Sequence, residues 1–159
     1  MNAEDVLLYG HRTVMKTIAG LPEEDWQTPG VTGFWSVKDV IAHMASHELA
    51  FLEILESFVE DIPTPTLDKF KQGIGIFNDP EVEARSHMSP GQVLDEYERT
   101  HARTLESIVQ IPESQRRQTG RLPWYGNEYD LEDFITYGVY GHKREHSAQI
   151  DAYRSRIGR

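Results

Sequence analysis

The stretch SVKDVIAHMASHELAFLEILESFVED, residues 36–61, indicates the fold most clearly. Its apolar residues recur at intervals of three and four, the pattern of a helix with one buried face. They are Val37, Val40, Ile41, Met44, Phe51, Leu55 and Phe58. Ser36 with Asp39 three residues later is similar to a helix-capping box, and Pro63 and Pro65 stop the pattern. The stretch therefore predicts a long amphipathic helix that ends near residue 61.

Three other stretches have the same periodicity, at about 3–19, 89–111 and 130–156. Gly20 and Pro22 end the first, because neither residue continues a helix well. The stretch 89–111 begins with Ser89 as a cap, Pro90 at the first helical position and Gln92 at the third, the favoured order at a helix start. We expect the stretch 130–156 to be one helix, the fourth of the chain. Its apolar face carries Leu131, Ile135, Gly138, Ile150 and Tyr153.

The remaining segments connect these helices. Residues 64–88 carry Gly73, Gly75, Asn78, Asp79 and Pro80, and predict a long connection with short helical turns near 67–71 and 81–87. Four long helices and no alternating strand pattern predict an all-α four-helix bundle, with a long crossover between helices 2 and 3. At 159 residues, we expect a single domain over 1–159.

Composition excludes several classes of function. The chain has 26 acidic and 16 basic residues, a formal net charge of −10, which disfavours nucleic acid or an anionic membrane as partner. Cysteine is absent from the sequence, which excludes disulfides, thiolate ligands and a cysteine nucleophile. Neither a secretory signal nor an apolar run long enough to span a membrane is recognisable. We therefore expect a cytoplasmic protein that acts on a small molecule.

Histidines are the notable polar residues of the predicted helices. Counting about 100° per residue from Ile135 places His142 and His146 at about −20° and +20°, in the middle of the apolar face. Side chains at i and i+4 lie about 6 Å apart, so both imidazoles can face one metal ion. His43 and His47 form a second pair with this spacing. The pattern alone is equally compatible with core histidines that bond to a carboxylate or carbonyl.

Two segments resemble the DinB/YfiT-like superfamily. Trp35-Ser36-Val37-Lys38-Asp39-Val40-Ile41-Ala42-His43-Met44-Ala45 is similar to its second-helix signature, and His142-xxx-His146-xx-Gln149-Ile150 to its fourth-helix signature. The resemblance implies a four-helix bundle and a metalloenzyme in which His43, His142 and His146 bind one divalent ion, zinc or nickel. Relatives include thiol-dependent transferases that use mycothiol, bacillithiol or glutathione, and many are dimers, so a thiol co-substrate and a homodimer are both implied.

Other residues complete the expected site. His47, which the family pattern does not require, is a candidate alternate ligand, base or group that orients the ligands. Glu48 is a candidate base or orienting group. Trp35, Trp124, Tyr125 and His101 are candidates for the wall of a substrate pocket. A metal ion with three imidazole ligands keeps one position open for a water or a thiol. These features predict a thiol S-transferase or a hydrolase.

Two alternatives stay open at this point. Leu122-Pro123-Trp124-Tyr125 is similar to a loop of the colibactin self-resistance branch of the same fold, which does not need the histidine triad. That similarity implies a metal-independent binding or self-resistance protein. A carboxylate-bridged di-iron bundle is disfavoured, because it needs Glu-xx-His on two helices and only Glu98 and His101 have this spacing.

Overall fold

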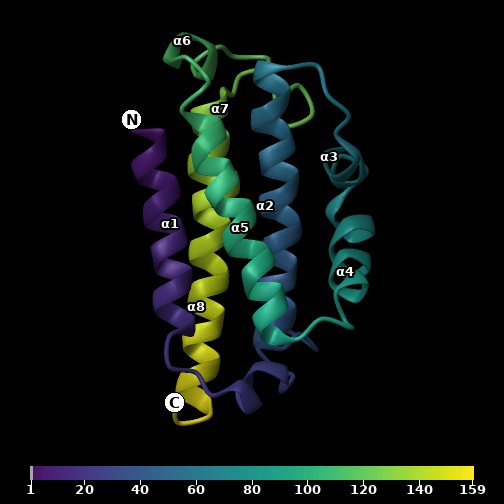
Figure 1. The fold of residues 1–159 in the computed structure, drawn as a ribbon, viewed down its shortest axis with the longest axis vertical. Coiled ribbons are helices and arrows are strands. Elements are labelled where there is room, and N and C mark those ends of the chain that lie inside the picture. The colour runs from purple at the N-terminus through teal and green to yellow at the C-terminus, as the bar shows by residue number, and fades with distance from the viewer. Residues whose placement is uncertain (1) are drawn as a thin grey trace.

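Four long helical segments lie side by side in the computed structural model, which describes residues 2–159 (Figure 1). They are α1 (Ala3–Ile18), α2 (Val37–Val59), α5 (Pro90–Ile108) and a continuous segment made of α7 (Leu131–Phe134), η2 (Ile135–Tyr140) and α8 (Gly141–Arg156). Within the described residues there is no strand, only an isolated β-bridge between Thr32 and Trp35. The predicted all-α bundle is therefore confirmed.

The helix starts follow the predicted capping chemistry. Ser36 Oγ accepts a hydrogen bond from the Asp39 amide, and the Asp39 side chain accepts one from the Ser36 amide. Ser89 and Gln92 form the same reciprocal pair at the start of α5. Asp130 and Asp133 form a third pair before α7. Each box pairs amides that lack partners within the helix, which explains the sharp boundaries.

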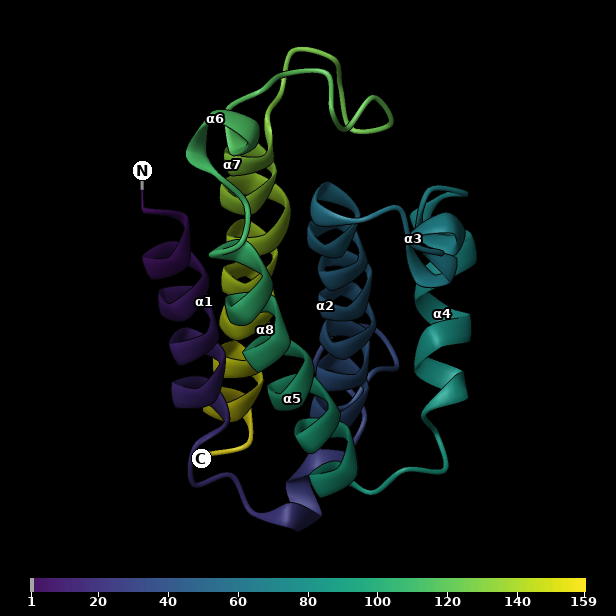
Figure 2. The ribbon, with the colours of Figure 1, turned by 45° about the horizontal axis from the view of Figure 1, so that its top comes forward.

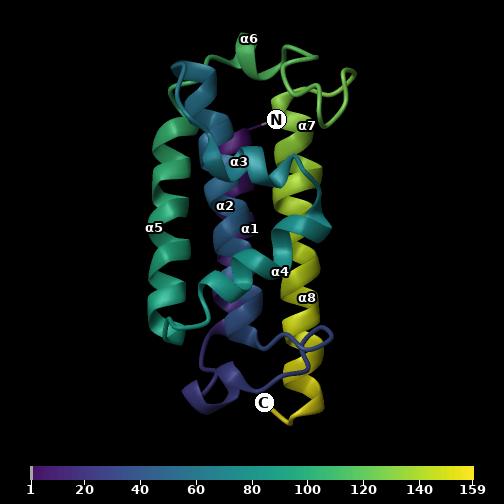
Figure 3. The same cartoon turned by 90° about the vertical axis from the view of Figure 1, so that its right-hand side faces the viewer.

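The order of helices in space is not a simple up-and-down sequence. The chain passes down α1 and up α2, returns along the outside of the bundle, and then passes up α5 and down α8 (Figures 1 and 2). The return path contains α3 (Pro65–Phe70) and α4 (Ile74–Ala84), which pack on α2 (Figure 3). As a result α2 and α5 run parallel. The predicted long connection between the second and third long helices is this crossover.

The crossover is more helical than its sequence indicates. We expected a turn at 81–87, whereas α4 begins at Ile74 and contains Pro80 in its interior. Phe77 is 1% exposed, and its ring lies 5.4 Å from the ring of His47 on α2. Burial of this ring outweighs the local cost of the proline, because tertiary packing commonly overrides propensity.

The fourth long segment also differs from the prediction. It contains a π-helical stretch, Ile135–Tyr140, in which the wider turn takes up an additional residue. The buried face therefore moves by one position: Val139 and Lys143 are buried where a regular helix would bury Gly138 and His142. The predicted helix is therefore present over Leu131–Arg156, but it is irregular, and Gly138 is only partly buried while Val139 is buried.

A polar layer divides the interior of the bundle. Apolar side chains form one cluster around Val40, Met44, Tyr97 and Ile150 and another around Leu55, Ile108, Leu131 and Ile135. Between them each long helical segment contributes a residue with a polar side chain. These residues are His11, Glu48, His101 and Lys143.

The 3₁₀ helix η1 (Glu23–Gln27) and the short helix α6 (Glu113–Arg116) lie in the connections at opposite ends of the bundle (Figure 1). No helix among residues 2–159 has both the length and the apolar character that a membrane crossing requires.

Candidate metal centre

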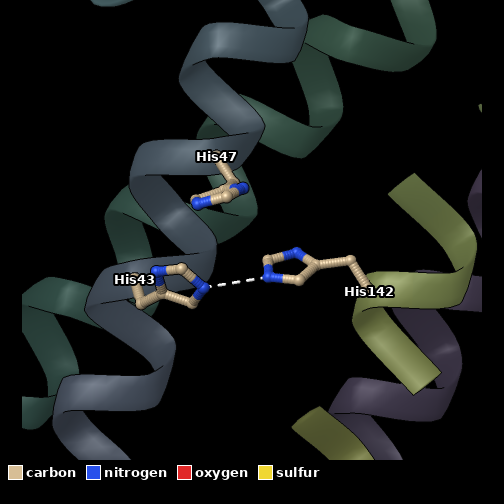
Figure 4. A group of neighbouring side chains, drawn as sticks. All are labelled: His43, His47 and His142. Atoms are coloured by element: carbon tan, nitrogen blue, oxygen red, sulfur yellow. Dashed lines mark hydrogen bonds between the residues drawn. The ribbon is translucent and has the colours of Figure 1, made fainter. Parts of the chain in front are cut away.

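Four histidines from two helices meet between α2 and α8. Nε2 of His142 lies 2.9 Å from Nε2 of His43 and 2.9 Å from Nε2 of His146. His47, one turn after His43, stacks on the His142 ring with centroids 4.4 Å apart. Figure 4 shows His43 and His47 on one helix facing His142 on the other. The i, i+4 spacing on each helix thus produces one cluster rather than two separate pairs.

The ring of His146 is oriented by its own helix. Its Nδ1 donates a hydrogen bond to Oε1 of Gln149, 2.8 Å away and three residues later. With the proton on Nδ1, the lone pair of Nε2 points at the cluster. Metal-binding histidines in proteins usually donate their other ring N–H in this way.

The ring of His47 is oriented differently. Its Nε2 donates to Oδ1 of Asn78 on α4 at 3.0 Å, which leaves Nδ1 with the lone pair. His43, His47 and His142 each offer a nitrogen within 4.8 Å of the others. These three therefore form one group of possible ligands, and His146 joins it through the 2.9 Å contact of its Nε2 with Nε2 of His142.

The surroundings keep these imidazoles neutral. Burial, with smaller contributions from His47 and His146, lowers the pKa of His43 to about 2. Burial, reinforced by neighbouring imidazoles, holds the pKa of His142 well below its ordinary value. Burial also lowers the pKa of His146. Neutral imidazole is the form that binds a metal ion, so the site is prepared for a cation at neutral pH.

The chemistry of the three Nε2 atoms fits a divalent ion. Nε2 of His142 either carries one proton or has one lone pair, so it satisfies only one of its two 2.9 Å contacts well. A cation shared by three lone pairs removes that conflict. Nitrogen ligands of a tetrahedral ion lie about 3.3 Å apart. The His43–His142 and His142–His146 pairs therefore need to separate by only a few tenths of an ångström.

Two cavities meet at the cluster. An inner cavity of about 190 Å³ lies between α2, α3, the 122–126 turn and the π-helical stretch. An outer cleft of about 550 Å³ lies on the other side, bordered by the 32–35 loop, α4 and α8. His47 and His142 belong to the walls of both. The cluster is therefore reachable from the cleft and also faces a mostly apolar chamber.

Glu48 lies in the buried polar layer beside the cluster. Its Oε1 accepts from His101 Nδ1 at 3.0 Å, and its Oε2 pairs with Lys143 Nζ at 2.7 Å. Burial alone would raise the pKa of Glu48, but Lys143 and the His101 hydrogen bond together lower it to about 2. His11 stacks on His101 with centroids 4.1 Å apart. Glu48 is thus an ionised structural anchor whose two oxygens are both occupied.

The other predicted pocket residues are distributed between the two cavities. Trp35 lies against His43, with ring centroids 4.9 Å apart, and lines the outer cleft. Trp124 and Tyr125 line the inner cavity. His101 is absent from the described residues that line either cavity, and its hydrogen bond to Glu48 agrees with the simpler expectation for a core histidine.

Several residues of the site were not foreseen. Asn78 and Asp79 come from the crossover, whose sequence contained no signal that it would reach the histidines. Phe70 and Phe134 build walls of the inner cavity. Lys143 could have been identified, since it is a basic residue next to His142, but its burial depends on the π-helical stretch.

Comparison with known proteins agrees with this architecture. Residues 8–150 match the sequence model of the DinB superfamily. A Bacillus licheniformis protein named "Putative metal-dependent hydrolase" is 27% identical over 141 residues, which are 88% of this chain and 76% of that protein. No solved structure gives a significant match. The match to the family spans nearly the whole bundle, including both histidine pairs, so this chain belongs to the DinB superfamily.

Proposed function

We propose that this protein is a divalent-metal-dependent hydrolase whose ion is held by Nε2 of His43, His142 and His146. The observation that carries the proposal is the convergence of these three atoms, two contacts of 2.9 Å, at the junction of the two cavities. The Gln149 hydrogen bond, which fixes the His146 ring, supports this ligand set over the one with His47. The name of the Bacillus licheniformis relative supports the reaction class.

A zinc or nickel ion in this site would supply an open coordination position and acidify the water or thiol that occupies it. His47 is the proposed proton acceptor, because it faces both cavities and Asn78 holds its Nε2–H, leaving Nδ1 as a base. Glu48 is a poor base, since both of its oxygens are already bonded. Hydrolysis adds one water across an ester or amide bond and yields an acid and an alcohol or amine.

Metal analysis tests the ligand set. We expect about one zinc or nickel ion per chain in untagged protein, measured by plasma mass spectrometry. His142→Ala and His146→Ala should lose the ion while helical circular dichroism is preserved, and His87→Ala, at an exposed position, is the matched control. His47→Ala should keep the ion but lose hydrolysis. Loss of metal in His47→Ala with retention in His146→Ala would instead establish the set His43, His47 and His142.

A thiol S-transferase is the second candidate. The sequence holds no cysteine, so a thiolate at the metal would have to come from a co-substrate such as bacillithiol, mycothiol or glutathione. The outer cleft of about 550 Å³ is large enough to admit part of such a molecule. Two assays separate the reactions. Loss of free thiol in the presence of a model electrophile reports the transferase, and release of acid from a model ester reports the hydrolase. A folded protein that binds no metal would favour the metal-independent binding protein.

A further inference from the structure

The histidine cluster lies where two cavities of different character meet. His47 and His142 line both the inner cavity and the outer cleft. A substrate whose reacting bond lies at the cluster can therefore extend one group into each cavity. The chemistry of the two cavities then defines the two halves of the molecule that carries this bond.

The inner cavity is built for a compact apolar group. Its walls are mostly aromatic and aliphatic, with Phe51, Phe70, Trp124 and Phe134 around it. Two charged residues reach it, Glu48 and Lys143, but they are paired with each other at 2.7 Å. An apolar cavity of about 150 Å³ is known to hold benzene, so about 190 Å³ corresponds to a phenyl ring or a branched chain of similar size.

The outer cleft has the opposite character. Asp79 and Glu145 line it, and the described residues in its wall include neither lysine nor arginine. Phe34, which is 93% exposed, also lies in this wall beside Trp35. A cleft that contains an exposed aromatic ring and carboxylates attracts a cationic group and disfavours an anionic one.

We propose that the substrate joins a phenyl-sized apolar group, bound in the inner cavity, to an uncharged or cationic polar group, bound in the outer cleft. This inference rests on the proposed function for the position of the reacting bond. The two binding sites themselves are independent of the metal. They can therefore be tested without any reaction.

Three probes with the same ring and different charge provide the test: benzyl alcohol, benzyltrimethylammonium and phenylacetate. Each is titrated into metal-free full-length protein, followed by ligand-observed NMR, in low salt and in 0.5 M salt. We expect saturable binding of the alcohol and the cation, with the cation at least threefold tighter than phenylacetate. High salt should reduce the ratio of the two affinities, because it screens the charges of Asp79 and Glu145 in the outer cleft.

Variants locate the two subsites. Ala50, buried on α2, lines the inner cavity, so Ala50→Phe should weaken binding of benzyl alcohol at least tenfold. Ala102→Phe, the same change at an exposed position of α5, should leave binding unchanged. Val139→Phe is the second filling variant if Ala50→Phe fails to fold. Asp79→Asn with Glu145→Gln should remove the preference for the cation.

The outcomes are distinct from those of the metal analysis. Absence of binding of all three probes to the wild type, or equal binding by folded Ala50→Phe, would overturn the inner subsite. Phenylacetate binding as tightly as the cation would overturn the outer one. A protein that binds the probes as expected but no metal would refute the hydrolase proposal and leave both subsites in place.

Discussion

Replacement of Glu48 by alanine removes the carboxylate that joins two other members of the polar layer. Lys143 pairs with it at 2.7 Å and His101 donates to it at 3.0 Å, and the side chains of all three are at most 4% exposed. After the change, the Lys143 ammonium is left in the middle of the bundle without its counter-charge. The apolar clusters above and below cannot supply another one.

The expected loss of stability is about 3–5 kcal/mol, the usual cost of removing one partner of a buried ion pair. The lowered pKa of Glu48 indicates a loss of stability of similar size. A change from 4.5 to about 2 corresponds to about 3 kcal/mol of stabilisation of the ionised form. Replacing the pair together, Glu48→Leu with Lys143→Met, should recover most of this loss, because neither charge then remains buried.

Urea unfolding of metal-free protein in EDTA measures these differences without a contribution from metal binding. Glu56→Ala is the matched control, since it removes a glutamate from the same helix whose partner Arg103 is exposed. It should cost about 1 kcal/mol or less. A loss below about 1 kcal/mol for Glu48→Ala, or a double variant no more stable than the single one, would refute the reasoning.

Three further predictions concern the site and its support. Gly138→Ala should cost about 1–3 kcal/mol in urea unfolding, because a Cβ there lies 2.6 Å from the Phe134 ring; an unchanged midpoint would contradict this. Gln149→Leu should weaken metal affinity about 10–100-fold in chelator competition by releasing the His146 ring, and equal affinity would argue against that role. Stability should decline from pH 6.5 to pH 4, because burial lowers the pKa of folded His11 to about 4 and the unfolded chain takes up the proton first; a flat urea midpoint over this range would show that His11 does not contribute.

Much of the helical framework follows from local patterns. The second long helix was predicted from its apolar spacing and from Ser36 and Asp39, and the structure confirms both. The start of α5 was predicted in the same way. These predictions succeed because capping boxes and amphipathic spacing act within a few residues of the chain. The crossover was predicted as a connection but not as two helices, since Phe77 becomes buried only when α2 is beside it.

The candidate site was also predicted only in part from the sequence. Spacing alone placed His142 and His146 on one face, and the family resemblance added His43. The structure brings these three together, while their role as ligands remains a proposal. The contacts of His47 with Asn78 and of Glu48 with Lys143 join residues 31 and 95 positions apart, and no periodicity reveals such pairs.

Local sequence specifies which segments become long helices, where they start, and that two helices each carry a pair of histidines. These properties depend on neighbouring residues and are encoded in their spacing. Packing between the helices rotates α8 by one residue after the π-helical stretch, so that Lys143 enters the core beside His142. It also places the crossover at the border of the histidine cluster. Both results arise from packing between distant segments, where burial of Val139, Phe77 and Phe134 outweighs the local preference of the chain.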